Sequence, residues 1–463
     1  MKWITVWNQL KDQCLTAIIQ ACGKVEVTKP DVTVLGKYLT LSTGSNDDGD
    51  IMVNLNNPIF KDMYTKLEDI GQLVVQISSD NTIHFSGFKI PSIKGRPLKA
   101  LTFFIQRETF IPYLFDSKSL PSESKTETGP VLIINLAEDE HREWSRYRMT
   151  YVAECLARLC ELKYQKAKYM TIKEIESQEN FSGDMPKEDE AIQAYYKKER
   201  PDPNPKKRFI NYLKLFPNIL RPNNGYQLIY VVINLNDKQI LDDAFAILKL
   251  SAISQDVLNT VNLFTVADAI SESNFEQIST QINTQIKDQC RSTDKEEYSP
   301  ETLATLVNFC LRYQMISTAT PSLGRLNASK NKDAVFVQYN HARLFKLITK
   351  FNSSCDPKDV PKIDYSLLVQ QAEWEMIIQC LLKAGSFFDD FQKRSFSSIH
   401  QMIGLLDNIT NKISVFYNSV RIITELNEKT LPLAVARVEL VKELLNLLKK
   451  FIYSMHAEAV ENI

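Results

Sequence analysis

The sequence is poor in the residues that build phosphate-binding loops and metal centres. Of its 463 residues, 13 are glycine and 5 are histidine. It contains no G-x-x-x-x-G-K-[ST], G-x-G-x-x-G, G-x-S-x-G or H-E-x-x-H motif, which excludes the commonest nucleotide-binding, hydrolase and zinc-protease signatures. The histidines are far apart, and no two cysteines form a C-x-x-C pair. We therefore expect neither a cofactor nor a bound metal ion.

Long hydrophobic runs and ordered cysteine spacing are also missing. No apolar stretch approaches 18 residues, and the apolar start, residues 1–7, is soon interrupted by Asn8 and Gln9. The eight cysteines are scattered, mostly in apolar helical surroundings, which is typical of reduced, buried thiols. These absences predict a soluble cytoplasmic protein that does not contact membranes.

An excess of positive charge is absent as well. The 55 Lys and Arg residues are balanced by 56 Asp and Glu residues, so a basic field over the whole protein is excluded, and any contact with RNA must come from local patches. The densest basic segment lies within a charged, proline-rich insertion, residues 173–208. We consider two interpretations of this segment, a solvated surface loop or a set of phosphate contacts. The phosphate contacts would come from Lys197, Lys198, Lys206, Lys207 and Arg208.

Shifts in pattern along the chain predict three domains and a linker. Residues 1–115 alternate short apolar runs with turns, which predicts a small α+β domain with strands at 25–38, 71–79 and 82–90. The polar residues 116–129 are expected to form a linker. Residues 130–298 alternate apolar strands (130–135 and 226–234) with helices (143–163 and 238–250), which predicts a Rossmann-like α/β domain.

The last region, residues 299–463, has a helical pattern throughout. Apolar residues recur at alternating spacings of three and four over 399–423, which predicts a helix of an α-helical bundle that includes Phe416. We expect Phe416 and the adjacent Tyr417 to lie in the core. Asp364 is a candidate N-cap for a helix over 365–383, and Pro432 is expected in the loop before the final helix. The predicted fold class is therefore multidomain, α/β plus all-α.

The stretch FVQYNHARL, residues 336–344, carries the candidate site. Helical spacing places Phe336, Tyr339 and Arg343 along one stripe, which offers two rings for unpaired bases and one charge for a phosphate. An aromatic pair at this spacing is also typical of a hydrophobic core, with an arginine whose apolar stem packs and whose head reaches solvent. Periodicity alone leaves both interpretations open.

This stretch resembles the entry helix of the DALR anticodon-binding domain of class I arginyl-tRNA synthetases. Further similar strings follow in the expected order, namely 364–368, Glu373-Trp374-Glu375, 415–422 and 436–440. The resemblance implies tRNA contacts from the entry helix, from the final helix and from the last residue. Arg343 and Arg437 are expected to contact RNA or to pair with carboxylates inside the bundle. The implied tRNA-binding residues are Phe336, Gln338, Tyr339, His341, Arg343, Lys346, Arg437 and Ile463.

The resemblance also shows what the chain has lost. Arginyl-tRNA synthetases carry a His-x-Gly-His signature at the start of the helix that continues into Leu156-Ala157-Arg158-Leu159, and here Glu143-Trp144-Ser145-Arg146 stands in its place. A carboxylate there repels a triphosphate. Residues 316–322 stand where the Lys-Met-Ser-Lys loop belongs, and that tetrapeptide occurs nowhere in the chain. The degenerate signatures imply a pseudoenzyme with no catalytic residues and no small-molecule substrate.

Degenerate relatives of this kind imply an adaptor. Such a protein binds the anticodon arm of arginine tRNAs and presents them to a tRNA 3-methylcytidine methyltransferase. One alternative is a protein–protein scaffold that has lost RNA binding. The other is an enzyme, either synthetase-like or of a type not recognised, that uses a pocket in the α/β domain. Its expected titratable groups are Glu138, Asp139, Glu140 and His141.

Overall fold

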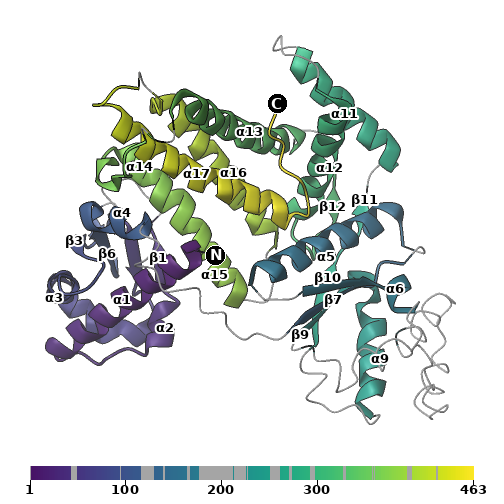
Figure 1. Cartoon of the computed structure of the whole chain (residues 1–463). Coiled ribbons are helices and arrows are strands. Elements are labelled where there is room, and N and C mark those ends of the chain that lie inside the picture. Colours follow the sequence, from purple (N-terminus) through teal and green to yellow (C-terminus); the bar gives the residue numbers. More distant parts are fainter. Residues whose placement is uncertain are drawn as a thin grey trace. The chain divides into compact units, whose positions relative to one another are not determined.

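The computed structural model of the chain is shown in Figure 1. Contacts between residues divide the chain into two compact units. Unit 1 comprises Met1–Ser124, Leu344–Lys393 and Ile409–Leu447, and unit 2 comprises Lys125–Arg343, Arg394–Asn408 and Leu448–Ile463. The structure describes residues 2–42, 49–93, 95–115, 130–138, 141–163, 167–176, 212, 226, 228–250, 261–270, 274–291, 298–326, 330–356, 358, 360–393, 399–423 and 426–463.

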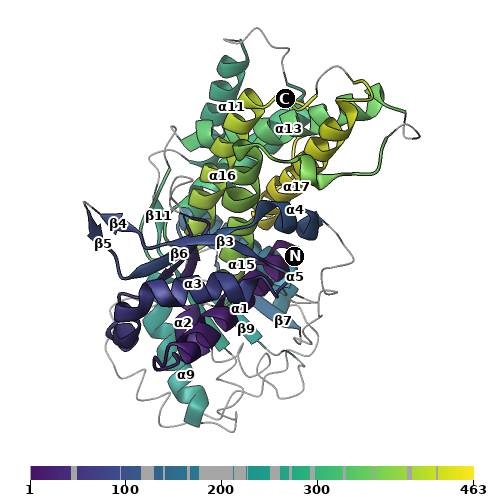
Figure 2. The same cartoon turned by 90° about the vertical axis from the view of Figure 1, so that its left-hand side faces the viewer.

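The N-terminal part of unit 1 is an antiparallel sheet packed against helices. Helix α1 (Lys2–Lys24) buries residues at helical spacing, including Trp3, Val6 and Leu10, and packs on α3 (Leu67–Ser78) and α15 (Lys383–Lys393). Figure 2 shows α1 and α3 beside the sheet, whose strand order is β1-β2-β6-β3. The strands are β1 (Leu39–Leu41), β2 (Ile51–Asn54), β3 (Phe85–Lys89) and β6 (Ala100–Ile105). Smaller elements are α2 (Val32–Gly36), η2 (Pro58–Lys66), β4 (Ser92–Ile93), β5 (Arg96–Pro97) and α4 (Arg107–Phe115).

Two of the strands predicted here are wrong, and one is confirmed. Residues 71–79 lie almost entirely in α3, whose buried positions recur at helical and not alternating spacing. Gly71 lets this helix approach the sheet, since a Cβ there would lie 2.3 Å from the ring of Phe88. Residues 25–38 contain the short helix α2, capped by Asp31, instead of a strand. The strand predicted at 82–90 is confirmed as β3.

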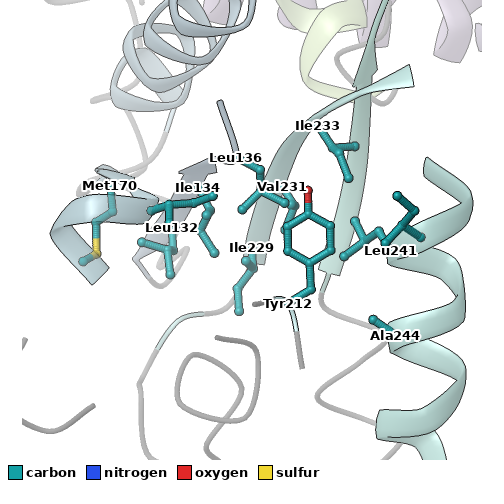
Figure 3. Close-up of a cluster of buried hydrophobic side chains, with 12 residues drawn as sticks. Leu132, Ile134, Leu136, Met170, Tyr212, Ile229, Val231, Ile233, Leu241 and Ala244 are labelled. Carbon is teal, nitrogen blue, oxygen red and sulfur yellow. The ribbon is translucent and has the colours of Figure 1, made fainter. Parts of the chain in front are cut away.

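The core of unit 2 is a parallel sheet in the order β10-β9-β7-β8. The predicted strands 130–135 and 226–234 are confirmed as β7 (Val131–Asn135) and β9 (Leu228–Asn234), and the predicted helices as α5 (Glu143–Lys163) and α9 (Lys238–Leu250). Figure 3 shows the side chains of β7 and β9 packed with Tyr212 and α9 in one apolar cluster. The other elements are β8 (Ala167–Thr171), α6 (Ile172–Glu176), η3 (Leu235–Asp237), β10 (Val261–Val266), β11 (Ala269–Ile270), α11 (Phe275–Arg291) and β12 (Gly324–Arg325).

The region predicted to be helical from residue 299 is mostly helical in the structure, with the short strand β12 as an exception. Asp364 is confirmed as a cap, but of a 3₁₀ turn, η4 (Tyr365–Leu367), and the α-helix starts only at Gln371 with its own capping box. Pro432 lies in the first turn of α17 (Leu431–Ser454) and not in the preceding loop. Proline is tolerated there because the N–H that it lacks would have no acceptor within the helix. The remaining helices are α12 (Pro300–Ser317), α13 (Lys330–Ser354), α14 (Gln371–Met376), the π-helix η5 (Ile377–Leu382) and α16 (Ile399–Ser419).

Helices α13, α16 and α17 each contribute residues to both units. The boundaries at 115, 129 and 298 stay a prediction. Among the described residues no three His, Cys, Asp or Glu side chains gather as metal ligands. Within the same part of the chain, no helix has the length and hydropathy to span a membrane. The seven cysteines whose side chains the structure describes are free thiols.

Candidate nucleic-acid interface

The stripe on the first half of α13 is partly accessible. Phe336, Tyr339 and Arg343 are each half-buried, so none of them is a fully buried core residue. The guanidinium carbon of Arg343 lies 5.9 Å from the ring centroid of Tyr339, a cation–π contact within one helix. The contact holds the ring and the positive charge together. This placement leaves open both interpretations that periodicity allowed for these three residues.

Gln338 and His341, on the same helix, hold the C-terminal tail of the chain. The Gln338 amide donates to the carbonyl of Glu458 and accepts from the N–H of Val460, both at 2.9 Å. The His341 Nδ1 lies 2.9 Å from the Val460 carbonyl, so Nδ1–H donates to it. Both side chains are buried, and burial lowers the pKa of His341. These contacts give both side chains a structural role in holding the tail, and the RNA contacts expected of them stay a prediction.

Arg437 pairs with a carboxylate inside the bundle, as one of its two interpretations predicts. Its Nε lies 2.7 Å from a carboxylate oxygen of Glu373, and both side chains are buried. The other carboxylate oxygen of Glu373 accepts from the backbone N–H of Gln370 at the start of α14. The Nη1 of Arg437 donates to the carbonyl of Arg421 at 3.0 Å. The guanidinium thus fixes the loop that follows α16 to helix α14.

Next to that loop, unit 1 contains a cavity of about 310 Å³ with a basic lining. Lys346 and Lys350 come from the second half of α13, and Tyr417 and Arg421 come from the end of α16 and the loop after it. The three basic residues are exposed, and Tyr417 is half-buried. The apolar part of the lining consists of Leu347, Val420, Ile422 and Ile423. We refer to these eight residues as the basic pocket.

Of the basic pocket, the sequence interpretation found only Lys346. Tyr417 was expected in the core beside Phe416, but it lines the cavity, because it lies one position off the buried stripe of α16. The sequence signal for the pocket is the i, i+4 spacing, which places Lys346 beside Lys350 and Tyr417 beside Arg421. Of the other expected contacts, Ile463 is half-buried at the end of the tail. Lys197, Lys198, Lys206, Lys207 and Arg208 lie outside the described residues.

The edge of the parallel sheet where open α/β folds bind ligands carries hydrogen-bonded polar side chains. The chain passes from β7 to β8 on one side, whereas β9 lies on the other, so the carboxyl ends of β7 and β9 mark the switch point. At the end of β9, the buried Asn234 donates to Asp268 at 2.8 Å. Close by, Nε2 of His141 lies 2.8 Å from a carboxylate oxygen of Asp237, and both side chains are buried.

Of the titratable groups expected in an enzyme pocket, these contacts account for His141. The Glu138 N–H donates to Nδ1 of His141, so Nε2–H donates to Asp237. Burial alone raises the pKa of Asp268, but hydrogen bonds from Asn234, Ser145 and Asn236 hold it below its usual range. Asp139 and Glu140 lie outside the described residues.

Arg148 of α5 binds the backbone of the segment that stands where a Lys-Met-Ser-Lys loop belongs. Its side chain is fully buried, and burial lowers its pKa to about 10 although the charge of Asp268 opposes this. Gly324 packs against it, since a Cβ there would lie 3.2 Å from the guanidinium. The guanidinium donates to five backbone carbonyls, those of Ala267, Asp268, Thr318, Ala319 and Ser322. A single guanidinium therefore joins the segment after β10 to residues 318–322.

Comparison with known structures defines the class of fold. The structure is similar to arginyl-tRNA synthetase from Plasmodium falciparum, with a TM-score of 0.62 and 13% identity over 99% of each chain. It is also similar to arginyl-tRNA synthetase from Thermus thermophilus, with a TM-score of 0.61 and 10% identity over 97% of this chain and 99% of that one. The chain thus has an arginyl-tRNA synthetase-like fold, as the sequence predicted.

The C-terminal helices have a more specific match. Residues 337–463 match the family described as DALR anticodon binding domain. No curated protein sequence matches the chain significantly. The basic pocket, the tail contacts of α13 and the Arg437–Glu373 pair all lie within the matched residues, whereas Phe336 directly precedes them.

Proposed function

We propose that the chain binds tRNA through its DALR domain and does not aminoacylate it. The observation that carries the proposal is the basic pocket inside the matched domain, because cationic side chains beside an aromatic ring are what single-stranded RNA binds. The balanced net charge fits recognition by such a local patch and not by the whole surface.

The proposal of a pseudoenzyme is supported by two features of unit 2. Glu143-Trp144-Ser145-Arg146 replaces the expected His-x-Gly-His, and Trp144 and Ser145 are buried. In addition, the switch point carries the His141–Asp237 and Asn234–Asp268 contacts. An ATP-dependent pyrophosphate exchange assay with arginine tests this part. Exchange at the rate of a synthetase control would contradict it.

The finer proposal is an adaptor for arginine tRNAs that recruits a 3-methylcytidine tRNA methyltransferase. It is supported by the order of the sequence motifs, which resembles that of the vertebrate and insect protein DALR anticodon-binding domain-containing protein 3. A methyltransferase needs an accessible base, which leaves the rest of the anticodon loop for recognition by a partner. A partner that binds the rest of the loop raises the effective concentration of the methyltransferase at the correct tRNA.

Cross-linking of the chain to cellular RNA, followed by sequencing, tests the proposal first. Enrichment of arginine tRNAs with contacts in the anticodon arm is the expected result. A folded chain that enriches no tRNA would overturn the proposal and favour a protein–protein scaffold. The methyltransferase step is tested separately, by comparing methylation of arginine tRNA transcripts with and without the chain.

A further inference from the structure

We propose that the basic pocket is a subsite for one unpaired nucleotide of the bound RNA. In this subsite the phosphate binds to Lys346, Lys350 and Arg421, and the base contacts Tyr417. The identification of the ligand as RNA rests on the proposed function, whereas the nucleotide chemistry of the pocket is argued from its own residues.

The arrangement of charge points to an anion. Lys346 and Lys350 are one turn apart on α13, a spacing at which like charges repel. Arg421 brings a third positive charge to the same cavity, and all eight lining residues are basic or uncharged. An anion placed among the three cations relieves their repulsion, so the pocket gains stability when a phosphate occupies it.

The rest of the lining points to a nucleotide and not to a phosphate alone. Leu347, Val420 and Ile422 are buried and form an apolar surface next to the half-buried ring of Tyr417. Such a surface suits the face of a base, which stacks on aromatic side chains whatever its sequence. A volume of about 310 Å³ is at the lower end of the usual range for small-ligand sites, which fits one nucleotide and excludes a duplex.

Arg437 is a positioning residue for this subsite. Arg421 follows the end of α16 and has no helical backbone to fix it, but its carbonyl accepts from Arg437, which Glu373 holds in place. The buried ion pair therefore sets where the side chain of Arg421 enters the pocket. On this proposal Arg437 acts on RNA binding through Arg421 and does not touch RNA itself.

The subsite is tested by titrating the full chain with arginine tRNA and with cytidine 5′-monophosphate at several salt concentrations. Lys350→Gln and Arg421→Gln are each expected to weaken tRNA binding about tenfold and to reduce the slope of log K against log salt by about 0.7. Tyr417→Ala is expected to weaken binding about 5- to 150-fold and to leave the salt slope unchanged. Lys429→Gln is the matched control, because Lys429 is exposed in the same unit and does not line the pocket.

The outcomes separate this inference from the proposed function. Tight tRNA binding that none of the three pocket variants alters would overturn the subsite and leave the proposed function intact. Binding of cytidine monophosphate that Arg421→Gln abolishes, without any binding of tRNA, would support the subsite and overturn the proposed function. Competition by inorganic phosphate as strong as that by the nucleotide would show that only an anion binds, and would overturn the contact with a base.

The positioning role has its own test. The double variant Arg437→Met/Glu373→Leu removes the ion pair without leaving a buried charge unpaired. It is expected to lower the salt slope as Arg421→Gln does, and the two changes combined are expected to have little more effect than either alone. Additive effects would show that Arg437 acts on RNA binding independently of Arg421 and would overturn the role.

Discussion

The guanidinium of Arg437 lies 2.7 Å from the carboxylate of Glu373, and almost no solvent reaches either side chain. Removing one partner leaves the other charge buried without compensation. We therefore expect Arg437→Met or Glu373→Leu alone to lower the free energy of unfolding by about 3–5 kcal/mol. The double variant is expected to cost far less, because no buried charge remains. Urea denaturation of the three variants measures this, and equal destabilisation of single and double variants would contradict it.

The five carbonyls that Arg148 binds lead to a second prediction. An ammonium has three donors and cannot reproduce the planar fork, so Arg148→Lys leaves buried carbonyls unpaired. We expect it to cost at least about 3 kcal/mol of unfolding free energy. Gly324→Ala is the companion variant, since its methyl group only crowds the same guanidinium and is expected to cost about 1–3 kcal/mol. An Arg148→Lys protein as stable as wild type would show that water satisfies these carbonyls.

The α/β layer was predictable from sequence because its signals are local. Each of the runs at β7 and β9 is a short, fully apolar segment followed by a helix, and a segment of that kind is stable mainly as a buried parallel strand. The segment of helix α3 has the local composition of a strand because Val74, Val75 and Ile77 are β-branched. Its packing against α1 and β3 decides otherwise, and that packing depends on contacts distant in sequence.

The candidate site was predictable only where it follows one helix. The stripe from Phe336 to Arg343 is visible in the sequence because helical spacing alone creates it. The basic pocket is not visible in the sequence. The carbonyl of Arg421 accepts a hydrogen bond from Arg437, 16 residues away, and Arg437 in turn pairs with Glu373. Likewise, nothing near His341 in the sequence indicates that it binds the tail at Val460.

The tail contact of His341 predicts a pH dependence. Burial lowers the pKa of His341 below its ordinary value of about 6.5, so His341 binds fewer protons when the tail is docked than when it is released. The contribution of His341 to docking is therefore complete above about pH 6.5 and is lost as the pH falls from there through the lowered pKa. Hydrogen-exchange protection of the Val460 amide, which donates to Gln338, measures the effect.

A control variant separates His341 from other groups that titrate near the tail. His341→Asn keeps an N–H donor near the position of Nδ1 and does not titrate. The pKa of His456 is also lowered, mainly by burial, so part of the pH dependence is expected to remain in the variant. Identical pH profiles for the two proteins would contradict the role of His341.

The basic insertion gives a prediction from sequence alone. Reversing the charges of Lys206, Lys207 and Arg208 to Glu is expected to weaken tRNA binding, and to reduce the salt slope by about 0.7 for each phosphate that the segment no longer neutralises. Neutral Gln substitutions at the same positions separate the removal of attraction from added repulsion. An unchanged salt slope would assign the segment to a solvated loop.

The half-buried ring of Tyr339 distinguishes an RNA contact from a core residue. If it stacks on a base, Tyr339→Ala lowers tRNA binding by about 1–3 kcal/mol, whereas Tyr339→Phe keeps the ring face and most of the affinity. Because the ring is only half-buried, the melting temperature is expected to fall less than for Phe309→Ala, whose ring is fully buried in unit 2. An equally large fall in melting temperature, with the affinity of the folded fraction unchanged, would instead place the ring in the core. The Arg343 cation above the ring would then be a structural partner of Tyr339, and recognition would depend on the basic pocket.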